Sequence, residues 1–331
     1  MAKEIAVLVA YKTFKVKKGK AMKQQTKEKK KLFKGERTAS TIIIIAGLIG
    51  FLIAIIYNAI PIITVILGVL SAMATYEVVK AVGNESKIVY TLACTVSLFT
   101  VFTVGFRIPL PPVSMLYSFY VLLLMSLTVF INKKVTFLHS VTAFFASTAL
   151  PYAFSCFIKL NNIQELKTEY THHEGIFLVG LGFACCWITD SFAYLVGRKF
   201  GKHKMCPNIS PKKSIEGAIG GIVFAAAFNI LLLVAFDVLC KKLYGHDIFG
   251  QSNMKYIFFI PVSMVLSLMS MVGDLTASVL KRNFGIKDYS NILPGHGGIM
   301  DRFDSIVFVV PMLYGTMVFV RFLEMFNIHL I

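Results

Sequence analysis

The sequence predicts an all-α polytopic membrane protein, and three observations support that fold class. Hydrophobic residues make up 56% of the 331 residues and charged residues only 15%, whereas soluble domains contain about 25% charged residues. The apolar residues occur in runs of about 20, which is the length that a helix needs to cross a bilayer. Basic residues gather on alternate connections between these runs, as expected for a multi-span protein.

Nine apolar runs are long enough to be interpreted as transmembrane helices. They cover residues 41–58, 60–80, 88–106, 113–132, 137–158, 175–197, 217–240, 256–280 and 305–323. The first two are separated only by a turn at residues 58–61, so they form either two spans or one broken element. Segment 107–112 ends the third run, because its prolines remove backbone donors and favour extended chain.

The distribution of Lys and Arg orients these spans. With an inside amino terminus and nine spans, the inside segments hold 27 of the 34 Lys and Arg residues. Because cytoplasmic connections are enriched in these residues, we expect a cytoplasmic amino terminus and an outside carboxy terminus. Loops 198–216 and 281–304 then share the cytoplasmic face.

We divide the chain into three regions. Residues 1–38 are a basic, disordered cytoplasmic leader, residues 39–170 an amino-terminal transmembrane region, and residues 171–331 a catalytic transmembrane region. The first 37 residues hold 13 Lys or Arg and three Glu. This charge favours the anionic leaflet over nucleic acid as a partner, at about 1 kcal/mol per basic residue near the surface. A solvated orientation tag is the alternative. Apolar run 5–10 is too short for a signal-peptide core, so no cleaved signal is expected.

The six cysteines are expected to be small buried hydrophobic residues. None forms a CxxC pair or another zinc-ligand spacing, and most fall inside apolar runs. We therefore predict neither disulfides nor cysteine metal ligands.

An acidic residue inside the sixth run marks the first polar group. Asp190 costs at least about 2.5 kcal/mol at the centre of a span, so it is expected to face a cavity or a partner. A hydrogen-bonded packing role beside Thr189 and Ser191 is the alternative. Further along, Gly217 and Gly221 form a pair of small residues four apart, which predicts close helix packing.

The basic connection after this run contains a candidate phosphate site. Ser210 and Pro211 fit the N-cap and first position of a helix. Lys212 and Lys213 would then lie near a helix start, where phosphate binds well. Taken alone the pattern is weak, since cytoplasmic loops are basic anyway.

The second polar group is a more specific functional signal than the first. Asp274, Ser278, Lys281 and Arg282 are spaced to share one stripe of the eighth helix. The carboxylate would lie about 10 Å below the two cations, at about 1.5 Å per residue. The arrangement predicts a carboxylate-held divalent ion deep in a cleft, with cations above it for phosphate groups. Snorkelling at a helix end is the alternative for the two cations, but not for Asp274.

A glycine loop and two more carboxylates follow. In Pro-Gly-His-Gly-Gly (294–298), the glycines allow positive φ and close backbone approach to a ligand, and the exposed N–H groups could bind an anion. Asp301 and Asp304 would share a face of the helix beginning there, although Asp301 could simply cap it. With Asp274, they are hard oxygen ligands of the type that Mg²⁺ takes together with substrate phosphates.

The pattern S-x-x-K-R-x(4)-K-D-x(5)-P-G-H-G-G-x-x-D-R-x-D, running from Ser278 to Asp304, resembles the signature of the phosphatidate cytidylyltransferases, also called CDP-diacylglycerol synthases. Segments 190–198 and 210–217 also resemble bacterial members of this family. Ile215 is a departure, because the family commonly has Trp there. The similarity is detailed over about residues 175–320, while the basic leader has no counterpart that explains it.

The resemblance implies conversion of CTP and phosphatidate to CDP-diacylglycerol and pyrophosphate. It implies dependence on Mg²⁺, with Asp274 and Asp304 as ligands and Asp301 as a ligand or a supporting residue. It also allows K⁺ as a second metal, and it implies a homodimer in the cell (inner) membrane with its active site facing the cytoplasm.

The remaining site residues are assigned within that reaction. The expected phosphate-binding cations are Lys281, Arg282, Arg302, Lys212, Lys213 and Lys287. His296 is expected to orient a phosphate oxygen, and Asp190 to support the site or a second metal. Ser278, Asp288, Gly297 and Gly298 complete the expected substrate site. Which cation meets CTP and which meets the lipid stays open.

Two other functions compete with this interpretation. Asp190 and Asp274 could carry protons or cations in a transporter, although a transporter does not need the whole signature. A related CTP-using enzyme could act on another lipid, because the signature does not read acyl chains.

Overall fold

The computed structural model describes residues 41–326 apart from residues 43, 84–85, 109–112, 132–133 and 294–295. The expected leader and the signal-peptide prediction therefore lie outside the described residues, as do Pro294 and Gly295 of the signature. All statements below about the structure refer to these residues only.

The described chain is almost entirely helical. Its helices are Ile44–Ile56, α2 (Ile60–Ala81), α3 (Lys87–Gly105), α4 (Val113–Phe130), α5 (Phe137–Asn161), α6 (His172–Phe200), α7 (Ile215–Tyr244), α8 (Met254–Asn283), α9 (Met300–Phe303) and α10 (Ile306–Glu324), with a 3-10 turn at Ile163–Glu165. Strands β1 (Lys204–Cys206) and β2 (Ser210–Ser214) form one antiparallel hairpin. Each helix lies within a few residues of a predicted apolar run, apart from the short α9.

Seven of the described helices are long and apolar enough to cross a membrane: α2, α3, α5, α6, α7, α8 and α10. Helices Ile44–Ile56 and Met115–Phe130 are apolar but shorter. The chain is therefore an all-α polytopic membrane protein, as the sequence predicted.

The first two apolar runs form two separate helices joined by a turn. Asn58 has a φ of +51°, and the side-chain amide of Asn161 donates to its side-chain oxygen at 2.9 Å. The carbonyl oxygen of Ile56 lies 3.2 Å from the ring of His172. The turn is therefore packed against the end of α5 and the start of α6.

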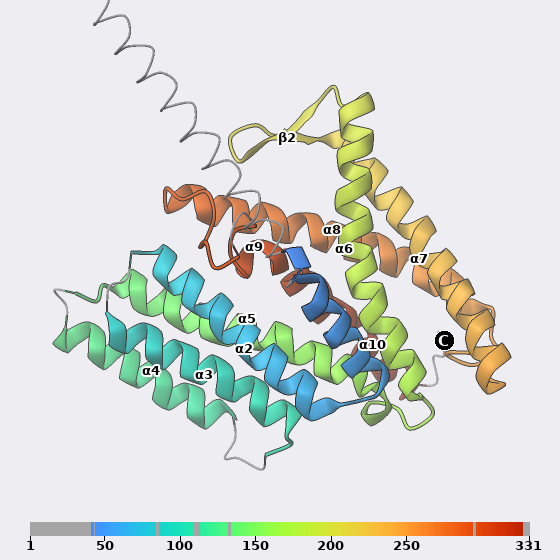
Figure 1. Cartoon of the computed structure of the whole chain (residues 1–331), viewed down its shortest axis with the longest axis horizontal. Coiled ribbons are helices and arrows are strands. Elements are labelled where there is room, and N and C mark those ends of the chain that lie inside the picture. Colours follow the sequence, from blue (N-terminus) through green and yellow to red (C-terminus); the bar gives the residue numbers. More distant parts are fainter. Residues whose placement is uncertain are drawn as a thin grey trace, which may run out of the picture.

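The helices pack as two groups with a shared centre (Figure 1). Helices α2, α3 and α5 pack against one another, and α4 packs on α5. Helix α6 lies along α7, while α8 contacts α6, α7 and α10. Because α10 also contacts α5, it links the two groups.

The packing of α6 against α7 depends on small residues. A Cβ on Gly217 would lie 2.5 Å from the carbonyl oxygen of Ala193, and one on Gly221 would lie 2.9 Å from that of Thr189. Both distances are too short for a carbon–oxygen contact, so only glycine permits this approach. The predicted packing role of Gly217 and Gly221 is confirmed.

Large apolar side chains lie both inside and outside the bundle. Phe154, Phe177 and Phe259 are fully buried, whereas Leu122, Val238 and Ile257 are more than half exposed. An exposed apolar surface of this kind suits contact with lipid. All six cysteines are free, and four of them are buried, which agrees with their expected role as small buried hydrophobic residues.

One end of the bundle is held together by buried charges. Glu174, near the start of α6, accepts hydrogen bonds from Thr171 N at 2.7 Å and Phe249 N at 3.2 Å. Lys255 is 2% exposed and donates to Asp237 at 2.9 Å. Asp190 lies 16 residues beyond Glu174, or about 24 Å along α6 at about 1.5 Å per residue. The polar residues of the predicted site are therefore at the other end.

Candidate active site

Three carboxylates come together at that other end, each from a different element. Asp190 lies on α6, Asp274 on α8 and Asp304 immediately after α9. Asp274 interacts electrostatically with both of the others. Gly273 allows this approach, because a Cβ there would lie 2.6 Å from the carbonyl oxygen of Asp304.

The environment of Asp304 favours an added positive charge. Burial, and then the Asp274 carboxylate, raise the pKa of Asp304 to about 7, although Lys281 and the backbone N–H of Ser305 act to lower it. Carboxylates that repel one another in this way are relieved when a cation binds. Mg²⁺ is commonly held by one or two carboxylates together with substrate phosphates, so Asp274 and Asp304 fit such an ion.

Asp301 has a different environment. Its Oδ1 accepts from Lys281 Nζ at 2.8 Å, and its Oδ2 accepts from Tyr289 N at 2.9 Å and Gly298 N at 3.0 Å. No group of three or more His, Cys, Asp or Glu side chains in the described chain is arranged to hold a metal ion. Of the two roles considered for Asp301, these contacts favour support of Lys281 and the loop over metal ligation. Asp301 also lies inside α9 and does not cap it.

The predicted helix start at Ser210 and Pro211 is wrong. These residues belong to β2, and α7 begins at Ile215. The N-cap is Ser214, whose hydroxyl accepts from Gly217 N at 3.2 Å. Both serines fit the N-cap pattern, and β1 pairs with both, Cys206 with Ser210 and Lys204 with Ser214. The helix begins only after the second serine, and the hairpin tolerates Pro211 because its strands are edges.

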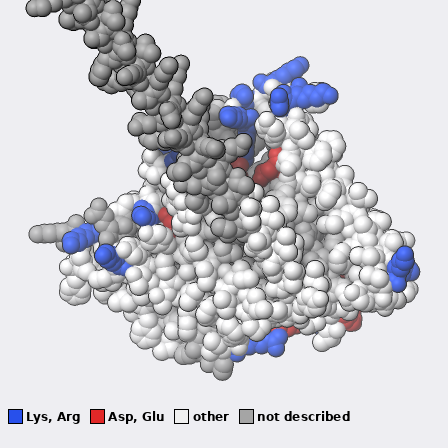
Figure 2. Space-filling model, in the orientation of Figure 1, with Lys and Arg blue, Asp and Glu red and all other residues white. Residues whose placement is uncertain are grey.

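The hairpin places one lysine on the carboxylate group. Lys213 Nζ forms an ion pair with Asp274 Oδ2 at 2.6 Å, and it also interacts with Asp190. Lys212, its neighbour on β2, is exposed. Figure 2 shows Lys and Arg side chains gathered at the hairpin end, with acidic side chains visible in a hollow beside them. The predicted N-cap was wrong, but Lys213 directly precedes the true N-cap, Ser214, and lies at the site.

The connection from the end of α8 to α9, here called the signature loop, makes contacts between its own residues and with its surroundings. Gly297 has a φ of +82°, which favours glycine. Arg302 Nε donates to the carbonyl oxygen of His296 at 2.9 Å, and the His296 ring lies 3.5 Å from Thr41 Oγ1. The backbone of His296 therefore lies beside the Arg302 side chain.

The other predicted residues lie around this centre. Ser278 Oγ lies 3.5 Å from Asp274 Oδ1, on the next turn of α8. Arg282, Lys287 and Asp288 are exposed at the end of α8 and on the loop that follows. They are accessible to a ligand, whereas Lys281 is directed to Asp301.

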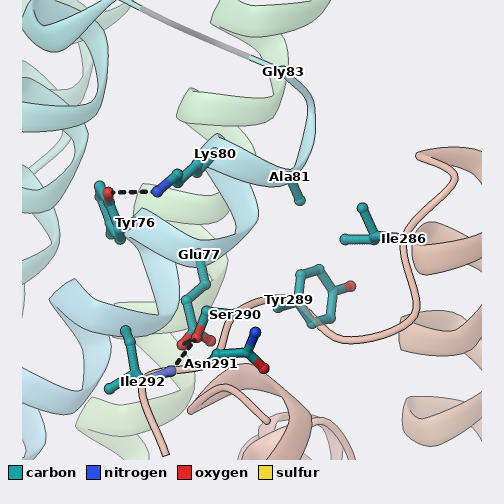
Figure 3. Close-up of a pocket in the computed structure, with 10 residues that line it drawn as sticks. All are labelled: Tyr76, Glu77, Lys80, Ala81, Gly83, Ile286, Tyr289, Ser290, Asn291 and Ile292. Carbon is teal, nitrogen blue, oxygen red and sulfur yellow. Dashed lines mark hydrogen bonds between the residues drawn. The ribbon is translucent and has the colours of Figure 1, made fainter. Parts of the chain in front are cut away.

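Sequence reasoning missed one acidic residue near the site. Glu77 of α2 is fully buried, and its carboxylate accepts from the backbone N–H groups of Ile299 and Met300 at 2.9 and 2.7 Å. It also accepts from the Ser290 hydroxyl (Figure 3). The available signal was a carboxylate inside an apolar run, which normally requires a buried partner.

A cavity of about 540 Å³ lies between the end of α2 and this loop (Figure 3). Its lining consists of Tyr76, Glu77, Lys80, Ala81, Gly83, Ile286, Tyr289, Ser290, Asn291 and Ile292. None of the three clustered carboxylates lines this cavity. The Lys80 ammonium donates to the Tyr76 hydroxyl at 3.2 Å.

The fold and the site together define a membrane protein with a cluster of charged residues at one end of its helices. Comparison with known proteins identifies the family. The model of the cytidylyltransferase family matches residues 36–320, so the chain belongs to that family.

Curated relatives agree with this assignment. The chain is 37% identical over 196 residues to the phosphatidate cytidylyltransferase of Bacillus subtilis strain 168, which covers 59% of this chain and 65% of the relative. It is 43% identical over 143 residues to the enzyme of the same name from Staphylococcus aureus strain COL, covering 43% of this chain and 50% of the relative. The matched region thus spans between half and two thirds of these relatives.

Proposed function

We propose that the protein is a phosphatidate cytidylyltransferase that converts CTP and phosphatidate to CDP-diacylglycerol and pyrophosphate. The observation that carries the proposal is the pairing of Asp274 with Asp304, beside Lys213, in a chain of the cytidylyltransferase family. Relatives named phosphatidate cytidylyltransferase support the choice of lipid acceptor.

The reaction does not require a strong base from the protein. A phosphate oxygen of phosphatidate attacks the α-phosphorus of CTP, a new P–O bond forms, and the bond from the α-phosphorus to the bridging oxygen breaks. Pyrophosphate leaves with that oxygen. Because the attacking oxygen is already anionic near neutral pH, catalysis depends on holding the two phosphates in line and neutralising their charge.

Asp274 and Asp304 are the residues that would hold Mg²⁺, with Asp190 nearby as support. When bound, such an ion stabilises negative charge on the phosphate oxygens. Burial, and then repulsion by Asp274, raise the pKa of Asp304, and the removal of that repulsion by a divalent cation supports this assignment.

Basic residues around these carboxylates would bind the phosphates. Lys213 pairs with Asp274 in the structure, so it is placed to move to the triphosphate when a cation occupies the carboxylates. Lys281 is oriented by Asp301, and Arg302 stays close to His296. The exposed candidates are Lys212, Arg282 and Lys287, with Ser278 and Asp288 beside them. The backbone N–H groups of Gly297 and Gly298 remain candidates for phosphate contact.

We further propose that the site faces the cytoplasm and that the chain crosses the membrane about nine times, with the carboxy terminus outside. The excess of Lys and Arg at the site end supports the orientation. The first helix supports a separate first crossing, because Thr41 lies near His296 at the site end and Ile56 lies near His172 at the other.

A homodimer and K⁺ as a second metal complete the proposal. Both follow from the resemblance of the signature. The mass of the purified protein in detergent tests the first, and activity in K⁺ against Na⁺ buffer tests the second.

The main experiment measures product formation by purified protein in detergent. Wild type, Asp274→Asn and Asp304→Asn would receive labelled CTP, Mg²⁺ and phosphatidate. Each substitution should lower the rate about 100-fold or more, since it removes a charge that acts in the transition state. Asp247→Asn is the matched control, because Asp247 pairs with Lys241 beyond the far end of α7. No product with phosphatidate or any other phospholipid acceptor would contradict the proposed function, and product with another lipid alone would replace the acceptor.

A further inference from the structure

Glu77 joins the amino-terminal half of the chain to the signature loop. It lies on α2, one turn before the end of the helix, and is fully buried. All three of its hydrogen-bond donors belong to residues 290–300, more than 210 positions away in the sequence. A buried carboxylate needs such donors, because an unpaired one is strongly destabilising.

The geometry uses both carboxylate oxygens. Oε1 accepts from Ile299 N at 2.9 Å and from the Ser290 hydroxyl, and Oε2 accepts from Met300 N at 2.7 Å. Figure 3 shows the Glu77 side chain extending from α2 toward Ser290. An amide in the same place would present an N–H₂ group to one of these donors, so Gln is a poor substitute.

Gly298 lies directly against this carboxylate and leaves no space for a side chain. A Cβ on Gly298 would lie 2.5 Å from Oε2 and 2.6 Å from Oε1 of Glu77. The φ of Gly298 is not in the left-handed region, so space, and not backbone conformation, is what excludes a side chain here. The glycine of the signature and the glutamate of α2 therefore form one unit.

We propose that Glu77 is a positioning residue for the reaction proposed above. It fixes the backbone of residues 299 and 300, directly before Asp301, Arg302 and Asp304. Through them it sets the position of one carboxylate of the metal pair and of the support for Lys281. In this proposal Glu77 contacts neither substrate and acts only through the loop. The proposal therefore rests on the proposed function.

Kinetics distinguish positioning from simple stabilisation. Glu77→Gln should lower kcat by about 10-fold to 100-fold, the effect of displacing reacting groups by about 1 Å, at temperatures where the variant remains folded. The matched control is Glu174→Gln, which replaces a buried glutamate bound to backbone N–H groups at the other end. The control should lower the melting temperature but keep kcat. A normal kcat in folded Glu77→Gln would overturn the proposal.

A double-substitution cycle tests the contact itself. Gly298→Ala should lower kcat in the wild-type background, because its new methyl group meets the Glu77 carboxylate. In the Glu77→Ala background the space is free, so the same change should cost at least about threefold less. Equal costs in both backgrounds would show that Glu77 does not set the loop position.

Hydrogen exchange gives a readout that needs no activity. In Glu77→Gln, the amides of residues 296–304 should exchange faster, while those of α6 near Glu174 should not change. Unchanged exchange in the loop would overturn the positioning role. If wild type forms no CDP-lipid but loop exchange responds as expected, the proposed function fails while the contact between α2 and the loop stands.

Discussion

The ammonium nitrogen of Lys213 lies 2.6 Å from Oδ2 of Asp274, so a residue of the polar hairpin neutralises a carboxylate of the proposed metal pair. Both side chains are partly accessible, at 26% and 30%. The Lys213 nitrogen itself is buried, and the oxygen that it meets belongs to a carboxylate proposed to bind the cation. The ion pair is therefore better understood as a competition between Lys213 and a divalent cation for the same oxygen.

Replacing Lys213 should strengthen cation binding. In Lys213→Met the cation no longer has to displace an ammonium group, so half-maximal thermal stabilisation should require about tenfold less Mg²⁺, which corresponds to about 1.4 kcal/mol. The KM for CTP should rise at the same time, because a phosphate ligand is lost. Melting curves in detergent over a Mg²⁺ series measure the first effect.

Lys212→Met is the control for this change, since Lys212 lies on the same strand but is exposed. It should leave the Mg²⁺ dependence of melting unchanged. Identical Mg²⁺ dependence in wild type and Lys213→Met would refute the competition.

Stability without divalent ions should depend on pH through Asp304. Its pKa is raised to about 7, first by burial and then by Asp274, with Asp190 acting in the same direction and Lys281 in the opposite one. A free carboxyl titrates near about 3.9, so between these values the folded protein binds more protons than the unfolded chain. Stability contributed by this proton is present at low pH and is lost as the pH rises through about 7.

The measurement is the melting temperature in chelator between about pH 5 and about pH 8, where we expect a decline. Asp304→Asn should flatten that decline. A melting temperature that rises with pH in wild type, or an unchanged slope in the variant, would contradict the assignment.

The packing of α6 against α7 can be tested by comparing a glycine at the contact with one outside it. Gly217→Ala should destabilise the protein by about 1–3 kcal/mol, because the new Cβ would lie 2.5 Å from the carbonyl oxygen of Ala193. Gly180→Ala, on α6, has open space around it and should be neutral or stabilising by up to about 1 kcal/mol. Equal melting temperatures for the two variants would exclude a tight α6–α7 contact.

The sequence predicted the helices well because lipid imposes a simple rule on them. Long apolar runs must become helices, since no other single segment satisfies its backbone in hydrocarbon. The ends were less well predicted. Helix α6 begins at His172 because Thr171 and Glu174 form a capping box, and α8 continues to Asn283 beyond its apolar part.

The site was predicted only as far as local spacing reaches. The turn from Asp274 to Ser278 is a local relationship, and it is present. The hairpin was missed because Ser210 and Ser214 both fit an N-cap, and spacing along the chain does not show that the residues up to Ser214 pair with β1 before α7 begins. Glu77 was missed because its donors lie in a distant part of the sequence, a relationship that spacing along one helix does not contain.

The orientation can be tested with a native cysteine. Cys206 lies on β1 at the site end and is partly exposed. Cys94 is also partly exposed but lies within the apolar helix α3, and the other four cysteines are buried. A membrane-impermeant thiol reagent should therefore label inverted vesicles and not intact cells. Cys206→Ser should abolish the labelling. Labelling of intact cells through Cys206 would place the site outside.

Lys281 and Asp301 should behave as one catalytic unit, because Lys281 Nζ lies 2.8 Å from Asp301 Oδ1. The Asp301 side chain is only 5% exposed and accepts two backbone N–H bonds as well, so it holds the lysine in a fixed position. Asp301→Asn and Lys281→Met should each lower kcat by about 10-fold to 100-fold.

In the double variant the losses should not multiply, because Asp301 can help the reaction through Lys281 only while that lysine is present. The rate should remain within about threefold of the slower single variant, which is the sign of strong coupling. Steady-state kinetics on the four proteins give the answer. Fully multiplicative losses would mean that Asp301 acts independently of Lys281, and its assignment as a metal ligand would then have to be restored.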